Sequence, residues 1–264
     1  MNKKETSGKQ AKPAYTSTEL MATIAAKQLE DGKSVFLGTG MPIIAGTLAQ
    51  KTHAPNLLIV FEAGGVGPQI PTLPISVGDS RTFYRACSAT SMHDVMSAAS
   101  SGYIDFGFLG AAMIDKYGNI NTTVIGGWER PKVRLPGSGG ANDLGSFCRR
   151  TIILMRQEKT KFVEKLDFIT TPGYLTGPGA RERAGLPRGT GPYRVITQYA
   201  LYDFDEESKR IRLKSLHPGV NLETVLQNSG MDIIIPDHIE TSPEPTEKEL
   251  RILRKIDPLG MVIR

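Results

Sequence analysis

The sequence has few of the residues that usually carry a disulfide framework or a metal ion. Its 264 residues include two cysteines, four histidines and one tryptophan. Two cysteines are too few for a framework, so we expect a reduced, cytoplasmic setting. Cys87 and Cys148 have no C-x-x-C partner, and we expect both to be buried as small hydrophobes. Because no histidine or cysteine stands in metal-ligand spacing, no metal site is predicted.

Long apolar runs are missing as well. No run approaches the roughly 20 residues that a membrane-spanning helix needs, so no membrane partner is expected. The N-terminal stretch MNKKETSGKQAKPAYT is polar and basic and lacks the apolar segment of a secretion signal. We predict that residues 1–16 form a disordered lead and that residues 17–264 form a single domain.

The charge is not strongly of one sign. The net charge is +5, and outside the lead its basic excess gathers in Cys148–Lys165 and Ala180–Arg194. There the basic residues alternate with acidic residues or glycines and are not interleaved with aromatic residues on one face, so no nucleic-acid partner is expected. A solvated surface is the default interpretation of these segments. A polyanionic small molecule, such as a nucleotide-bearing cofactor, would suit them too.

What the sequence does contain is an alternation of helix and strand signals. This alternation favours an α/β fold with an open, mostly parallel twisted sheet, flanked by helices and extended by antiparallel hairpins. Helix starts are predicted from capping residues and from proline at a first helical position. The predicted strands are 34–38, 57–62, 103–110, 151–155, 167–170 and 232–236; the hairpins are 113–127 and 193–216; the helices begin at Thr16, Pro42, Ser91, Asn221 and Thr246.

Glu62 stands where a buried strand is predicted to end. Five apolar residues, Leu57–Phe61, run directly into it, and Ala63, Gly64 and Gly65 follow at once. A solvated strand end would explain this placement. So would a reactive carboxylate at the mouth of a cleft, with small neighbours that allow a bulky substrate to approach.

Two glycine-rich loops accompany Glu62. Phe36–Pro42 joins a strand to a helix and contains Gly38 and Gly40, so it is either a tight turn or an anion-binding helix start. Ile43 occupies the position of the third glycine of a dinucleotide fingerprint, which is therefore not supported. The second loop, Leu135–Asn142, has three glycines and a serine. It is either a flexible surface loop or a nest of backbone N–H groups that holds an oxyanion.

Four stretches resemble one known family. IVFEAGG, PISVGDSRTFYRA, AMIDKYGNINTTVIGGWERPKVRLPGSGGAN and DFITTPGYLTGPGARERAGLPRGTGP are similar to the B (β) subunit of the glutaconate CoA-transferase type of class I CoA-transferases. The resemblance runs from about Leu20 to the final helix. It implies the CoA-transferase (NagB-like) fold, an A (α) subunit as partner in a heterotetramer or heterooctamer, and Glu62 as the covalent nucleophile. It also implies a site lined by Gly137, Ser138, Gly139, Gly140, Ala141 and Asn142, and we add Ala63, Gly64, Gly38 and Gly40 as candidate lining residues.

The expected activity is transfer of CoA between an acyl-CoA and a short carboxylic or dicarboxylic acid, glutaconate-like, through a glutamyl–CoA thioester. Coenzyme A is then a substrate, and no permanently bound cofactor is expected. The first alternative is a CoA-ester hydrolase, ring-opening enzyme or decarboxylase on the same fold; such relatives tend to lack the glutamate. The second is a ligand-sensing module, which would need a DNA-binding segment. Asp79 and Arg81 are expected to form a structural pair.

Overall fold

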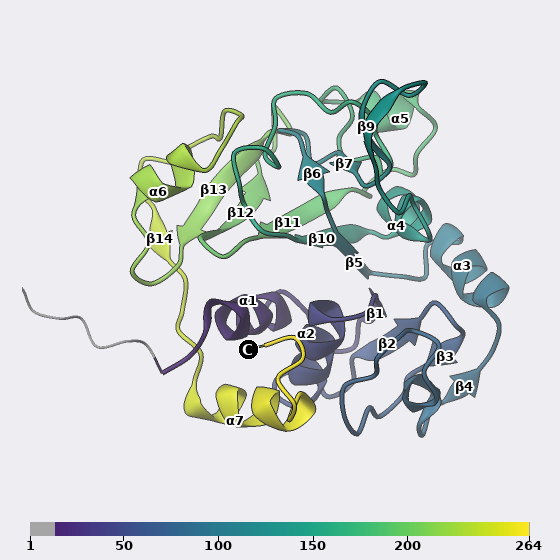
Figure 1. Ribbon diagram of the computed structural model, residues 1–264. Coiled ribbons are helices and arrows are strands. Elements are labelled where there is room, and N and C mark those ends of the chain that lie inside the picture. Colours follow the sequence, from purple (N-terminus) through teal and green to yellow (C-terminus); the bar gives the residue numbers. More distant parts are fainter. Residues whose placement is uncertain (1–13, 264) are drawn as a thin grey trace, which may run out of the picture.

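The computed structural model describes residues 14–263, so residues 1–13 of the expected lead and Arg264 lie outside the described part (Figure 1). The helices are α1 (Ser17–Ala26), α2 (Met41–Gln50), the 3₁₀ turn η1 (Ser80–Phe83), α3 (Met92–Ser100), α4 (Ala141–Phe147), α5 (Ala180–Arg183), α6 (Leu222–Gln227) and α7 (Glu247–Ile256). The strands are β1 (Ser34–Leu37), β2 (Leu58–Phe61), β3 (Gly65–Val66), β4 (Ser88–Ala89), β5 (Phe106–Gly110), β6 (Met113–Ile114), β7 (Ile120–Asn121), β8 (Val124–Gly126), β9 (Pro131–Arg134), β10 (Arg150–Leu154), β11 (Pro192–Ile196), β12 (Ala200–Phe204), β13 (Ile211–Leu216) and β14 (Glu240–Thr241).

Ten strands form one mixed sheet in the order β14-β13-β12-β11-β10-β5-β1-β2-β3-β4. Its centre, from β11 to β2, is parallel, and antiparallel pairs extend it at both flanks. This confirms the predicted open α/β sheet with antiparallel additions. We call the edge at which the parallel strands end the carboxyl edge, and the edge at which they begin the amino edge.

The two faces of the sheet are covered differently. Helices α1, α2 and α7 cover one face, where Leu37, Ile59 and Phe61 belong to one buried cluster (Figure 1). On the other face Phe36 and Val60 join a second cluster, which includes residues of α3, α4 and α6. The strand alternation, with a period of two residues, sends successive side chains to opposite clusters.

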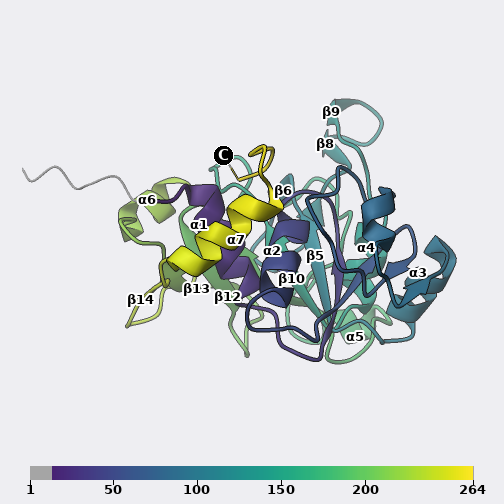
Figure 2. The ribbon, with the colours of Figure 1, turned by 90° about the horizontal axis from the view of Figure 1, so that it is seen from below.

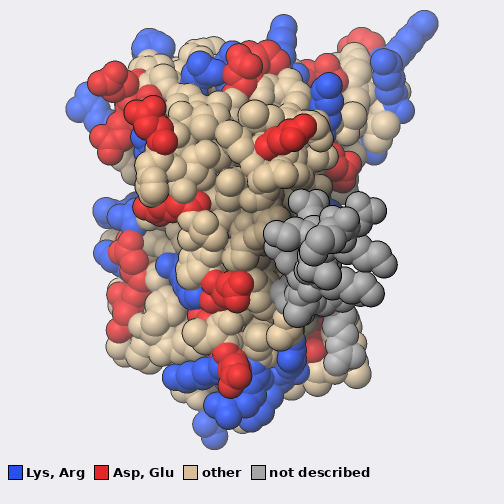
Figure 3. All heavy atoms as spheres, turned by 90° about the vertical axis from the view of Figure 1, so that its left-hand side faces the viewer, with Lys and Arg blue, Asp and Glu red and all other residues tan. Residues whose placement is uncertain are grey.

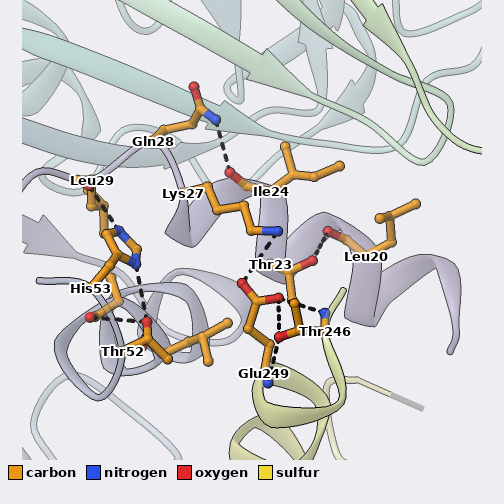
Figure 4. Close-up of polar contacts among 12 residues, drawn as sticks. Leu20, Thr23, Ile24, Lys27, Gln28, Leu29, Thr52, His53, Thr246 and Glu249 are labelled. Atoms are coloured by element: carbon orange, nitrogen blue, oxygen red, sulfur yellow. Dashed lines mark hydrogen bonds and ion pairs between the residues drawn. The ribbon is translucent and has the colours of Figure 1, made fainter. Parts of the chain in front are cut away.

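Capping boxes start α1, α3 and α7, as the sequence predicted. Figure 4 shows how α7 is held on α1. Glu249 donates its N–H to the side chain of the cap residue Thr246, and its carboxylate pairs with Lys27, the C-cap residue of α1, at 3.4 Å. A second ion pair joins Arg254 to Glu19, a carboxylate that is 3% exposed, with Nε to Oε1 at 2.7 Å. The final helix is thereby tied to the first across the whole length of the chain.

Some predicted elements are wrong. Residues 167–170 form no strand: Thr170 donates its N–H to Ile120 O at 2.8 Å, but the pairing with β7 is limited to the isolated bridge of Thr171 with Ile120. Residues 232–236 make only one isolated bridge, Ile234 with Arg212, and Pro236 has no N–H with which to extend it. The last strand of the chain is instead β14 (Glu240–Thr241).

Three further predictions can be compared with the structure. Cys148 is buried, as expected, but Cys87 is exposed on the loop before the edge strand β4, so the prediction of two buried thiols is wrong. Asp79 and Arg81 do pair, with Nε donating to Oδ1 at 2.9 Å. Ala14 and Thr16, which the predicted lead includes, bond to Arg254 and to the Ile263 carbonyl.

The surface carries mixed charge. Figure 3 shows basic and acidic side chains interspersed on one face, with basic ones gathered at its lower end. The β8–β9 hairpin stands out from the body (Figure 2) and carries Trp128, which stacks on Phe168 with centroids 5.3 Å apart. Across residues 14–263 the search for a membrane-spanning helix found none of sufficient length and apolarity.

Candidate active site

Glu62 lies directly after β2 at the carboxyl edge and is half-buried. The apolar strand that precedes it lies beside β1, with Leu37 in register with Phe61. Because Phe61 and Val60 belong to opposite clusters, the alternation places Glu62 on the face of Val60, the same face as α3 and α4. The carboxylate therefore projects from the sheet edge toward these two helices.

Gly64 and Gly65 follow Glu62 for a packing reason. A Cβ on Gly64, whose φ is +107°, would lie 2.0 Å from the Thr90 carbonyl oxygen, and one on Gly65 would lie 2.2 Å from that of Thr82. No side chain fits at either position. The sequence suggested that these glycines leave room for a bulky substrate. In the structure the space beside them is filled, and they let two neighbouring segments pack against the turn that holds Glu62.

The loop 137–142 lies against Glu62. A Cβ on Gly140 would stand 3.1 Å from Oε1 of Glu62 and 2.6 Å from Cε of Met96 in α3. Glu62 and the second glycine-rich loop, far apart along the chain, thus lie against each other. Met96 is a neighbour of the site that the sequence did not indicate, because its α3 position looks like that of any partly buried apolar residue.

Three of the six N–H groups of the loop 137–142 have acceptors within the described residues. Gly137 donates to Thr122 O at 2.8 Å, Ala141 to Ser138 O at 3.0 Å, and Asn142 to Ser138 Oγ at 3.1 Å. Within residues 14–263, the N–H groups of Gly139 and Gly140 donate no hydrogen bond. The N–H group of Ala141 is thus engaged, whereas those of Gly139 and Gly140 are available to an oxyanion.

A buried scaffold holds this loop in place. Asn142 donates from Nδ2 to Thr170 O at 2.9 Å, and Thr122 donates from its N–H to Thr170 Oγ1 at 2.8 Å. Asn119 is fully buried: its Oδ1 accepts from the N–H of Gly173 at 2.8 Å and its Nδ2 donates to Asp115 at 2.8 Å. Asn119 of the motif DKYGNIN thus fixes the segment that begins at Gly173, and Thr122, directly after the motif, bonds to the same Thr170 as Asn142.

A cavity of about 600 Å³ opens at the same sheet edge, on the side of α1 and α2. Gly38 lines this cavity. Because Leu37 and Phe61 are in register, the next residues along the two strands, Gly38 and Glu62, are neighbours. A side chain on Gly38 or on Gly110 would meet nothing within 4 Å. Gly40 does not line this cavity; it caps α2 with φ +79°. Arg156 is the charged member of the lining and is exposed.

The sequence and the fold were compared with those of known proteins. The family model "Coenzyme A transferase" matches residues 18–228. The chain is 38% identical to the B subunit of 3-oxoadipate CoA-transferase from Pseudomonas knackmussii, over 92% of this chain and 94% of that protein. It is also 38% identical to the B subunit of glutaconate CoA-transferase from Acidaminococcus fermentans, over 92% and 93%.

The crystal structure of glutaconate coenzyme A-transferase from Acidaminococcus fermentans superimposes with a TM-score of 0.89, covering 95% of this chain and 98% of that one at 35% identity. The chain therefore belongs to the coenzyme A transferase family, among the B subunits of the class I CoA-transferases. This confirms the family resemblance and the fold that the motifs indicated. CoA esters are the substrates of this family.

Proposed function

We propose that this chain is the catalytic subunit of a CoA-transferase and that Glu62 is its covalent nucleophile. One observation carries the proposal: the Glu62 carboxylate stands against Gly140, beside two backbone N–H groups without a protein acceptor in the described residues. A nucleophile next to preorganised donors is the arrangement that acyl transfer requires.

The reaction begins with attack of a Glu62 carboxylate oxygen on the thioester carbonyl carbon. The carbon–sulfur bond breaks, CoA leaves as a thiolate, and an acyl–glutamyl anhydride remains. The thiolate then attacks the glutamyl carbonyl carbon, and the donor acid leaves as a carboxylate. Glu62 now carries CoA as a thioester, and the acceptor carboxylate reverses these two steps. Each thioester broken is matched by one formed, so the protein lowers a kinetic barrier without a metal or redox cofactor.

Each addition to a carbonyl places negative charge on an oxygen. The N–H groups of Gly139 and Gly140 are the donors for this oxyanion, and removal of one such donor typically costs roughly 3 kcal/mol of transition-state stabilisation. The loop is well suited to this role because Ser138 and Asn142 fix it by hydrogen bonds that do not consume these two groups.

The acid is a short dicarboxylic acid, such as the glutaconate or 3-oxoadipate for which the relatives are named. The edge cavity supports this choice. Its lining combines apolar side chains with one cation, Arg156, which makes no ion pair within the described residues. One carboxylate of the acid would react at Glu62, and the other would pair with Arg156.

The active assembly includes an A (α) subunit, in a heterotetramer or heterooctamer. Both relatives are named as the B subunits of their enzymes, which supports a partner of the A type. The half-buried Glu62 and the open cavity lie at one sheet edge, where a second polypeptide could close the site and exclude water. The isolated chain should therefore lack robust transfer activity, and coexpression with an A-type partner should restore it.

Trapping tests the covalent mechanism. The assembled enzyme is incubated with an acyl-CoA and then treated with borohydride or hydroxylamine, and the peptide containing Glu62 is analysed by mass spectrometry. Reduction to the alcohol or conversion to the hydroxamate at Glu62 is expected, and neither in Glu62→Gln. An unmodified peptide under full turnover would contradict the proposal and favour the hydrolase, ring-opening or decarboxylase chemistry.

A further inference from the structure

The two basic segments of the sequence meet at the amino edge, away from Glu62. Arg149 and Arg150 precede or begin β10, and Arg181 and Arg188 precede β11, its parallel neighbour. These residues line two adjacent cavities of about 290 and 310 Å³, which share Arg149, Gly189 and Thr190. We call the surface formed by Arg149, Arg150, Arg181, Arg188, Lys209 and residues 189–191 the basic groove.

Positive charge in the basic groove is poorly balanced. Glu182 is the one carboxylate among the residues that line it, and Arg150 pairs with Glu30. Arg149, Arg188 and Lys209 make no ion pair within residues 14–263. The groove therefore attracts anions, and its concave walls concentrate the field.

Arg181 adds a fixed charge behind the groove. It is 2% exposed, and neutral groups hold it: its guanidinium donates to the carbonyls of Gly173 at 2.8 Å and Gly145 at 3.0 Å and to Thr190 Oγ1 at 2.8 Å. No carboxylate of the described chain pairs with it, and its Nε has no acceptor there. Because its acceptors are neutral, Arg181 adds its positive charge to the field of the groove.

The backbone supplies a second, independent sign of an anion. Three successive N–H groups, those of Gly189, Thr190 and Gly191, line the groove and donate no hydrogen bond to the described residues. Gly189 has φ +73° and Gly191 has φ +144°, conformations that favour glycine. Consecutive unpaired N–H groups in such a turn form a concavity that binds phosphate groups.

We propose that the basic groove binds the phosphate groups of a small phosphorylated ligand, of the size of a diphosphate or a nucleotide. Arginines and backbone N–H groups together are the usual donors to phosphate oxygens, and two adjoining cavities accommodate more than one phosphate group. The ligand is either the nucleotide part of CoA or a separate nucleotide. This inference does not depend on the chemistry proposed for Glu62.

Calorimetric titration of the full-length chain with inorganic pyrophosphate and with 3′,5′-ADP tests the groove. Arg149→Glu and Arg188→Glu reverse charges on two exposed side chains, and Lys248→Glu makes the same change on an exposed side chain of α7. We expect saturable binding that the first two variants each weaken about tenfold or more, and that Lys248→Glu leaves unchanged. Circular dichroism melting verifies that the variants are folded.

Absence of saturable binding of both probes, or equal weakening by Lys248→Glu, would overturn the proposal. A competition experiment identifies the source of the phosphates. Displacement of pyrophosphate by CoA would assign the groove to the substrate's own nucleotide. Displacement by ADP but not by CoA would assign it to a separate ligand. Both results support a phosphate site at the amino edge, and both can be obtained with Glu62→Gln, so the transfer mechanism is tested separately.

Discussion

The two edges of the parallel sheet use the same backbone device beside opposite charges. At the carboxyl edge, the N–H groups of Gly139 and Gly140 have no acceptor among the described residues, and Gly140 lies against the carboxylate of Glu62. At the amino edge, the N–H groups of residues 189–191 have no acceptor among the described residues, and the buried Arg181 donates to the side chain of Thr190 between them. The neighbouring side chain thus decides what the N–H groups bind. Beside a carboxylate nucleophile they stabilise negative charge that develops during the reaction. Beside arginines they bind a ligand that is already an anion.

Substitution of Glu62, at the carboxyl edge, should have the largest effect on the rate of transfer. Glu62→Gln removes the nucleophile and should abolish transfer. Glu62→Asp withdraws the carboxylate by one methylene and should lose on the order of 100-fold, since near-attack geometry tolerates about 1 Å. Neither change should cost more than about 1 kcal/mol of stability, because the side chain is half-buried at the edge. Transfer and hydrolysis rates with melting temperatures are the measurements; near-normal transfer by folded Glu62→Gln would remove the covalent mechanism.

Gly140→Ala should break the contact between the two parts of the carboxyl-edge site. The new methyl group would crowd Oε1 of Glu62 at 3.1 Å and Cε of Met96 at 2.6 Å. Met96 can move, but displacement of the carboxylate by about 1 Å should lower kcat roughly 100-fold. Gly127→Ala is the matched control, because a Cβ there meets nothing within 4 Å. Equal kcat for both variants would show that Gly140 does not set the position of Glu62.

The flank of the carboxyl edge should respond to pH. His217 is 1% exposed and bonds to Ser242 Oγ at 3.0 Å and Thr197 O at 2.9 Å, and burial lowers its pKa to about 4. Between pH 6.5 and 4 the unfolded chain takes up a proton that the folded chain does not. Stability from this group is therefore complete above pH 6.5 and falls by up to about 3 kcal/mol toward pH 4.

Urea unfolding at pH 7, 5.5 and 4.5 measures this loss. His217→Gln should be less stable at pH 7 but should show a shallower decline than the unsubstituted chain. His93→Gln, at an exposed position, should keep the original slope. Parallel declines in all three proteins would assign the pH dependence to other groups.

Arg156→Ala should have the smallest effect and should separate binding from chemistry. Loss of a charged hydrogen bond to the distal carboxylate should raise the KM for a dicarboxylic acid about tenfold while kcat changes little. For a monocarboxylic acid of the same length the KM should stay nearly constant. An equal rise for both acids would mean that Arg156 shapes the cavity without recognising the second carboxylate.

Local signals in the sequence were sufficient for much of the fold. The capping boxes at Thr16, Ser91 and Thr246 fix helix starts through bonds within four residues. The apolar runs before Gly38 and Glu62 form strands of the parallel part of the sheet, where both faces are covered and apolar side chains are favoured on each. Residues 232–236 meet β13 only at the isolated bridge of Ile234 with Arg212, and the segment after residue 167 meets β7 only at the bridge of Thr171 with Ile120, so neither pairing extends into a strand.

The sequence by itself determined the alternation of elements, the family motifs and the position of Glu62 at a strand end. Only the tertiary structure decided that Gly140 touches Glu62, that Gly64 and Gly65 serve packing, and that Ala141 already donates its N–H to Ser138. The same holds for the meeting of two basic segments at the amino edge. The physical reason is that caps and strand runs depend on neighbours along the chain, whereas free donors and unbalanced charges are defined by what folding brings, or fails to bring, within hydrogen-bonding distance.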